Sequence, residues 1–305
     1  MKLKKYLWGI IYSFVLTAFT FYVLMDTFVI TREYIVVPPP SSVVGGGVID
    51  DGLSEELGPI TPEITDTTYK DRNISITLTQ YREWETDIYV ADVRLSSAAY
   101  LKTAFAQNKV GRNIKEKTSE IAENNNAIFA VNGDYYGARE KGYVVRNGAL
   151  YRKTAAKDQE DLVIYGDGSF GIISESDVSA DQLLSDGAVQ VLSFGPALLK
   201  NGNVSVTQGQ EVGKAKASNP RTAVAIVDDL HYLFIVSDGR TEQSKGLSLY
   251  ELAEFIKSLG AETAYNLDGG GSSTMYFGGK VINVTTDDGK NFNERKVSDI
   301  VFIGY

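Results

Sequence analysis

Hydrophobic and polar positions alternate along much of the chain after residue 73, which predicts a series of short strands. Over residues 74–79, isoleucine or leucine alternates with serine or threonine, the period of a strand with one buried face. Residues 88–95 predict a second strand, with Asp92 and Arg94 on one face, where they either pair with each other or contribute to a site. Apolar runs on both sides of a polar turn predict three hairpins, over residues 143–151, 162–173 and 223–236.

Two segments have the periodicity of amphipathic helices. Residues 248–259 carry an apolar stripe, with Ser248 in position to cap the N-terminus and Gly260 to end the helix. Residues 113–124 predict another helix, which ends at three asparagines. An apolar strand follows each helix, over residues 127–131 and 261–265.

Both of these apolar strands end in polar residues that could form a site. The first ends in Asn132-Gly133-Asp134, and the second in Asn266-Leu267-Asp268 followed by Gly269-Gly270-Gly271-Ser272-Ser273-Thr274. Consecutive glycines let a ligand approach the main chain, whose N–H groups can form an anion-binding nest. A self-bonded tight turn is the alternative interpretation, and the polar residues on both sides of the glycines favour a binding site.

The N-terminus has the pattern of a membrane anchor. Lys2, Lys4 and Lys5 precede residues 6–25, which carry no formal charge. As a helix this run is about 30 Å long, enough to cross a bilayer, and the basic leader predicts a cytoplasmic N-terminus. A cleaved signal peptide is the competing interpretation, but no small-x-small site precedes Asp26.

This pattern predicts three parts of the chain. Residues 1–26 are expected to form a leader and a single-pass anchor in the cell membrane. Residues 27–72 are expected to form a linker, because they contain proline and glycine runs together with several acids. Residues 73–305 are expected to form an extracytoplasmic catalytic domain.

Composition narrows the chemistry available to that domain. The net charge of −9 argues against nucleic acid as a partner, since phosphate backbones require clustered cations. The chain has no cysteine and one histidine, His231, which we expect on the surface near the turn of its hairpin. Carboxylates and hydroxyls must therefore carry most of the acid–base chemistry.

Four polar segments stand out in sequence order: Asn132-Gly133-Asp134, Asn219-Pro220-Arg221-Thr222, Ser237-Asp238-Gly239-Arg240 and residues 266–274. With these segments at these spacings, residues 73–305 resemble the phosphodiester glycosidase family. Its animal members remove N-acetylglucosamine from mannose phosphate tags, and its bacterial members are often labelled as exopolysaccharide-related. The resemblance implies an α+β fold, a single compact domain of mixed or antiparallel sheet with packed helices. It also implies cleavage between an anomeric carbon and a phosphate diester.

The resemblance assigns roles to the polar segments. Asp134, Asp238 and Asp268 would supply a base or nucleophile and stabilise an oxocarbenium-like transition state, with their individual roles left open. Arg221 and Arg240 would grip the phosphate oxygens. The other expected substrate-binding residues are Asn132, Gly133, Thr222, Asn266, Gly269, Gly270, Gly271, Ser272 and Ser273. No cofactor is required, and a divalent cation such as calcium is left open, although no calcium-loop spacing is present.

The predicted function is that of a membrane-anchored glycosidase that hydrolyses a sugar-1-phosphodiester. The substrate would be an α-N-acetylglucosaminyl phosphodiester or a related glycan phosphodiester of the cell surface. The alternative is a non-catalytic membrane-tethered protein that binds glycans or assists exopolysaccharide assembly. Convergence of the three aspartates and two arginines in one cleft would favour the enzyme. The sequence sets no oligomeric state.

Overall fold

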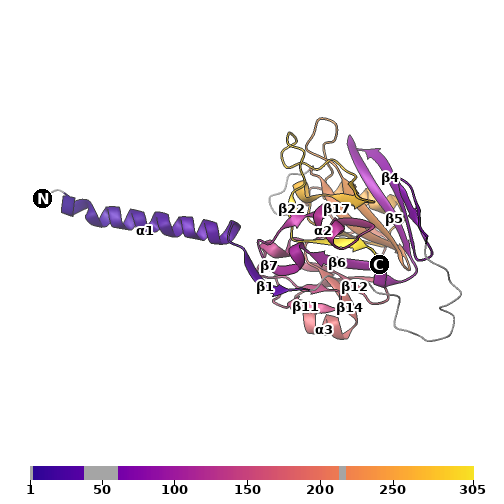
Figure 1. Ribbon diagram of the computed structural model, residues 1–305, viewed down its shortest axis with the longest axis horizontal. Coiled ribbons are helices and arrows are strands. Elements are labelled where there is room, and N and C mark those ends of the chain that lie inside the picture. The colour runs from indigo at the N-terminus through magenta and orange to yellow at the C-terminus, as the bar shows by residue number, and fades with distance from the viewer. Residues whose placement is uncertain (1–2, 38–60, 213–217) are drawn as a thin grey trace.

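A nine-stranded antiparallel sheet forms the centre of the computed structural model, which describes residues 3–37, 61–212 and 218–305 (Figure 1). The strand order is β16-β15-β19-β17-β18-β5-β4-β3-β2. The bounds are β2 (Glu63–Ile64), β3 (Thr68–Lys70), β4 (Ile74–Glu83), β5 (Thr86–Leu95), β15 (Ala197–Lys200), β16 (Asn203–Val204), β17 (Arg221–Asp228), β18 (His231–Ser237) and β19 (Thr263–Asn266).

Two five-stranded antiparallel sheets accompany the central sheet. One has the order β21-β20-β9-β23-β6 and the other β11-β10-β14-β12-β13. The bounds of the first are β6 (Leu101–Phe105), β9 (Phe129–Asn132), β20 (Met275–Phe277), β21 (Lys280–Val281) and β23 (Asp299–Ile303). Those of the second are β10 (Val144–Arg146), β11 (Ala149–Arg152), β12 (Glu160–Tyr165), β13 (Phe170–Ser174) and β14 (Ala188–Leu192). Two short pairs remain, β1 (Arg32–Val36) with β7 (Lys109–Arg112) and β8 (Glu116–Lys117) with β22 (Lys296–Val297).

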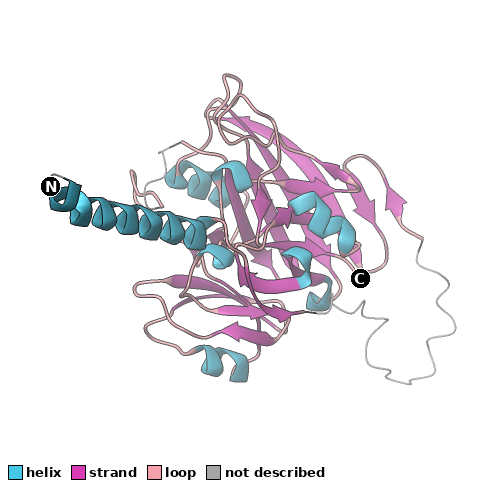
Figure 2. Ribbon diagram, turned by 60° about the vertical axis from the view of Figure 1, so that its left-hand side comes forward, coloured by secondary structure: helices cyan, strands magenta, loops and turns pink. Residues whose placement is uncertain are grey.

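Strand alternation gives the central sheet two apolar faces. Val224 and Phe234 point to one face and pack against Phe129 and Val131 of β9. Residues on the opposite face pack against helix α4 (Leu249–Ser258). The sheet therefore lies between the helix and the five-stranded sheets, and strands far outnumber helices (Figure 2).

The remaining helices are short, apart from the first. They are α2 (Thr118–Asn124) and α3 (Ala180–Ser185), with the 3₁₀ turns η1 (Ala98–Tyr100), η2 (Ala106–Asn108), η3 (Tyr136–Ala138) and η4 (Gly270–Ser272). The apolar N-terminal helix α1 (Leu3–Phe28) has 26 residues and projects away from the sheets (Figure 1). Its hydrophobic span, Tyr6–Phe28, is not buried against the domain, consistent with a signal sequence or a membrane anchor.

The expected fold class is confirmed, with differences in detail. The three predicted hairpins form, and Ser248 caps α4 in a capping box with Glu251. The helix expected over residues 113–124 begins only at Thr118, because Glu116 and Lys117 pair with β22 as strand β8.

One expectation about an exposed residue needs correction. His231 lies near its turn as expected but is buried, with 7% exposure, and its Nε2 is 3.0 Å from Asp92 Oδ1. The reason is that β18 is an interior strand, flanked by β17 and β5. Within the predicted linker, β1 pairs with β7 and β3 pairs with β4, while β2 pairs with β3. Residues 38–60 of that linker lie outside the described residues.

Candidate active site

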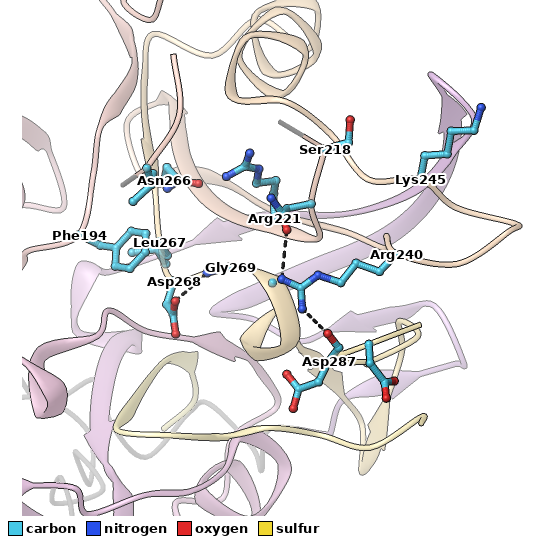
Figure 3. A pocket seen from close by; sticks show the side chains of 14 residues that line it. Phe194, Ser218, Arg221, Arg240, Lys245, Asn266, Leu267, Asp268, Gly269 and Asp287 are labelled. Carbon is cyan, nitrogen blue, oxygen red and sulfur yellow. Dashed lines mark hydrogen bonds between the residues drawn. The ribbon is translucent and has the colours of Figure 1, made fainter. Parts of the chain in front are cut away.

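A cleft of about 650 Å³ lies at one end of three neighbouring strands of the central sheet, β17, β18 and β19 (Figure 3). Because these strands are antiparallel, the start of β17 lies beside the ends of β18 and β19. The residues that line the cleft are Phe194, Val212, Ser218, Asn219, Arg221, Arg240, Lys245, Asn266, Leu267, Asp268, Gly269, Gly270, Asp287 and Asp288.

Hydrogen bonds to the main-chain groups of Asp268 fix its position in this cleft. Asn132, at the end of β9, donates from Nδ2 to the Asp268 carbonyl at 2.7 Å. The Asp268 N–H donates to the Gly133 carbonyl at 3.3 Å. Its carboxylate accepts a 3.0 Å hydrogen bond from the Gly269 N–H. The two polar strand ends predicted from the sequence therefore meet, and one positions the other.

The surroundings of Asp268 disfavour its charge. Burial raises the pKa of its carboxyl group, while a hydrogen bond from Ser272 and the charges of Arg295 and Arg139 act in the opposite direction. Asp268 also borders a second cleft of about 350 Å³, which contains Lys115, Arg295 and Lys296. A carboxyl group with a raised pKa at the wall of two clefts is well placed to exchange a proton with a ligand.

The glycine turn after Asp268 allows a close approach of neighbouring side chains. Gly270 has a φ of +63°, and a Cβ there would lie 2.7 Å from Arg240 Nη2. A Cβ at Gly271 would lie 1.8 Å from Asp287 Oδ1. Any side chain at these positions would displace Arg240 or Asp287 from the cleft.

Two guanidinium groups line the cleft, and both have partners in the protein. Arg240 donates to the Asp287 carbonyl at 2.6 Å and to Asn219 Oδ1 at 3.1 Å (Figure 3). Arg221 is buried, with 3% exposure. It donates from Nε to the Leu247 carbonyl at 2.9 Å and from Nη2 to Glu211 at 2.5 Å. These contacts fix the orientation of both cations before any ligand binds.

Several of the expected binding residues are buried around the cleft. Thr222 donates from Oγ1 to Asn132 Oδ1 at 2.8 Å, which orients the Asn132 side chain toward Asp268. A Cβ at Gly133 would collide with the Asp299 carboxylate, so this glycine allows close packing. Asn266 lines the cleft and donates to the Gly195 carbonyl at 2.8 Å, while its buried Oδ1 has no hydrogen-bond partner among the described residues. Ser272 and Ser273 are buried in the turn behind Asp268.

The other two expected catalytic aspartates do not line this cleft. Asp134 is fully buried and pairs with Arg146 at 2.9 Å, beside Asp299, which pairs with the same guanidinium at 2.7 Å. Asp238 accepts from the Val284 N–H at 2.9 Å and from the Tyr89 hydroxyl at 3.3 Å. Burial raises the pKa of Asp238 to about 6. Of the five charged residues expected to converge, Asp268, Arg221 and Arg240 do so.

Two features of this region were not expected from the sequence, Asp287 in the cleft and the buried Arg146–Asp299 pair. Asp287 precedes Asp288 and Gly289 in a polar turn, a signal that resembles the segments singled out above. The Arg146–Asp299 pair joins two apolar strands 153 residues apart, and no local pattern indicates it. Within residues 3–37, 61–212 and 218–305, no three histidine or acidic side chains converge as metal ligands, and the calcium prediction stays a prediction.

The family described as phosphodiester glycosidase matches residues 125–304, a range that contains all four polar segments. The chain belongs to the phosphodiester glycosidase family. The N-acetylglucosamine-1-phosphodiester alpha-N-acetylglucosaminidase of Mus musculus is 32% identical over 160 residues, which are 48% of this chain and 30% of the mouse protein.

Two further similar proteins extend the comparison. The SPbeta prophage-derived uncharacterized protein YomE of Bacillus subtilis is 30% identical over 202 residues, 64% of this chain and 30% of that protein. The chain thus spans about a third of the length of these curated relatives. The catalytic domain of the zebrafish N-acetylglucosamine-1-phosphodiester alpha-N-acetylglucosaminidase, auto-inhibited by its pro-peptide, has the same fold. That structure superposes with a TM-score of 0.59 and 18% identity, over 90% of this chain and 88% of the other.

Proposed function

We propose that the chain is a membrane-anchored glycosidase that hydrolyses a sugar-1-phosphodiester outside the cytoplasm. The observation that carries the proposal is that Asp268 shares one cleft with the guanidinium groups of Arg221 and Arg240. A phosphodiester glycosidase needs a carboxylate near the anomeric carbon and cations near the phosphate. The name of the mouse relative supports the same class of substrate.

The cleft residues divide the proposed reaction between them. The bond from the anomeric carbon to the phosphate oxygen breaks, its electrons stay with the phosphate, and water supplies the new oxygen on the sugar. Arg221 and Arg240 stabilise the phosphate as its charge increases, so little proton donation to the leaving group is needed. Asp268 stabilises the positive charge on the sugar ring and accepts the proton of the water.

In this proposal Asp134 and Asp238 do not contact the substrate, but they position parts of the chain that form the cleft. Asp134 accepts from the Ser193 N–H at 2.8 Å, next to Phe194 of the cleft wall. Asp238 anchors the segment at Val284 and lies directly after β18, two residues before Arg240. Both are therefore proposed as positioning residues, whose loss changes the shape of the cleft.

The expected orientation of α1 in the membrane suggests where the substrate is found. The span Tyr6–Phe28 is long enough to cross a bilayer, and the lysines before it favour a cytoplasmic N-terminus. An uncleaved α1 would then hold the domain at the outer face of the cell membrane. A glycan phosphodiester of the cell wall or capsule is the substrate within reach.

The test is hydrolysis of a panel of sugar-1-phosphodiesters by the full chain in detergent micelles. The expected result is equimolar release of sugar and phosphomonoester from at least one member, beginning with α-N-acetylglucosaminyl diesters. Asp268→Asn is the matched inactive control. Saturable binding of the panel with no release from any member would refute hydrolysis and favour the glycan-binding alternative.

A further inference from the structure

A separate cleft of about 400 Å³ lies where the N-terminal segment meets the domain. We call it the juxtamembrane cleft. Residues of β1, β7, η3 and the β10–β11 hairpin form its walls. They include Arg112, Arg139 and Arg152, together with Tyr34, Tyr136 and Tyr151.

The end of α1 is attached directly to the wall of this cleft. Asn113 donates from Nδ2 to the carbonyl oxygens of Thr27 and Ile30, both at 3.1 Å. Four residues after the helix, β1 begins and pairs antiparallel with β7 (Figure 1). At about 3.3 Å per residue, Tyr34 lies within roughly 20 Å of the helix end. The cleft is therefore close to the membrane surface if α1 spans the bilayer.

The inner wall of the juxtamembrane cleft is rich in cations. Arg112, Arg139 and Arg152 all line it, and the one carboxylate among the lining residues is Glu140. Glu140 pairs with Arg112 at 3.1 Å and is itself 78% exposed, so it lies at the rim. The lining thus carries a net positive charge, in a chain whose overall charge is −9.

Arg152 has an unused hydrogen-bond donor in this wall. Its Nε donates to the Gly142 carbonyl, and its Nη1 donates to the carbonyls of Tyr136 and Arg139. Its Nη2 is buried and has no hydrogen-bond partner within the described part of the chain. This buried Nη2 is not accessible from the cleft, so Arg152 contributes to the wall through the positive charge of its guanidinium group.

The remaining lining is apolar and aromatic. Tyr136 and Tyr151 both pack edge-to-face on Phe105, which holds their rings in place. Ile35, Val110 and Val144 add aliphatic surface. Tyr34 is 64% exposed beside the anchor, and tyrosine is enriched at the headgroup level of membranes. Guanidinium groups beside such a lining suit a ligand with both an anionic and an apolar part.

We propose that the juxtamembrane cleft binds the anionic phosphate headgroup of a membrane lipid. The inference rests on retention of α1, and it does not depend on which reaction the active-site cleft performs. A free phosphate offers the same charge, but it would leave the apolar wall uncovered. Lipid binding would fix the domain in one orientation on the membrane.

Binding of dihexanoyl phosphatidylglycerol to the full chain in neutral detergent micelles tests this proposal by calorimetric titration. Arg112→Gln should weaken binding at least about tenfold, because it removes a charge-assisted contact while the strand pairing stays intact. Arg94→Gln is the control, since Arg94 is also a strand arginine paired with a carboxylate but does not line the cleft, and it should change binding less than twofold. Arg152→Gln removes three backbone contacts and risks unfolding, so Arg112→Gln is the deciding variant.

Further titrations distinguish binding of the lipid headgroup from binding of the acyl chains or of free phosphate. Dihexanoylglycerol, which lacks the phosphate, should bind at least tenfold more weakly, and inorganic phosphate should not displace the lipid at equal concentration. Equal binding of dihexanoylglycerol, or displacement by phosphate, would overturn the lipid assignment. A larger loss in Arg240→Gln than in Arg112→Gln would place the lipid in the active-site cleft instead. Recovery of a mature chain that lacks α1 would also overturn the proposal.

Discussion

Replacing Asp268 with asparagine should abolish most of the activity while keeping the fold. The amide has nearly the shape of the carboxylate, and its Oδ1 can still accept the 3.0 Å hydrogen bond from Gly269. The bonds from Asn132 and to Gly133 use the Asp268 main chain, so they are unaffected. The substitution therefore removes the charge and the proton-accepting group from a site that otherwise stays in place.

The expected loss follows from the role of a positioned acid–base group. Such groups contribute about 100-fold or more to turnover, which corresponds to about 2.7 kcal/mol of activation free energy. Stability should change in the opposite direction. Because burial raises the pKa of Asp268, its ionised form costs folding free energy at neutral pH, and asparagine avoids that cost. The variant should be less active and at least as stable.

The assay compares kcat for one sugar-1-phosphodiester with the midpoint of thermal unfolding, both at pH 7. Asp288→Asn is the matched control, because Asp288 lines the same cleft but is exposed to solvent, and its turnover should fall less than threefold. Near-normal turnover in Asp268→Asn would refute the mechanism. An unfolding midpoint several degrees lower would show that the carboxylate stabilises the cleft instead.

Four further predictions test other parts of the structure. Arg221→Lys should raise KM about tenfold, because lysine keeps the charge but loses the planar fork; an unchanged KM and kcat would exclude the phosphate contact. His231→Ala should lower the unfolding midpoint through loss of the Asp92 contact and change kcat less than twofold, and a loss as deep as that of Asp268→Asn would contradict the mechanism. The folded-state pKa of Asp238 is about 6, above its unfolded value of about 3.9, so the folded state binds more protons and the free energy of unfolding should fall by roughly 3 kcal/mol in all between pH 4 and 6. Asp238→Asn should flatten that part of the denaturation profile, and an unchanged slope would argue against the shift. Protease treatment of intact cells should remove the domain and leave α1 in the membrane, whereas a soluble form that starts near Asp26 would show cleavage.

Much of the fold could be predicted from local patterns in the sequence. The alternation over residues 74–79 predicts β4, and Asn147-Gly148 predicts the turn between β10 and β11. Ser248 and Glu251 predict the start of α4. These features depend on residues a few positions apart, whose side chains decide which backbone conformation has the lowest free energy. The polar strand ends around Asp134 and Asp268 were visible for the same reason.

The arrangement of those strand ends was decided only by the tertiary structure. Asp134 and Asp268 follow similar apolar strands, yet one is buried against Arg146 and the other lines the cleft. Asn132 supports Asp268 across 136 residues of sequence, and β1 pairs with β7 across more than 70. Such contacts depend on which strands become neighbours in the sheets. Burial and hydrogen bonding throughout the domain settle that choice, and no short segment carries the information alone.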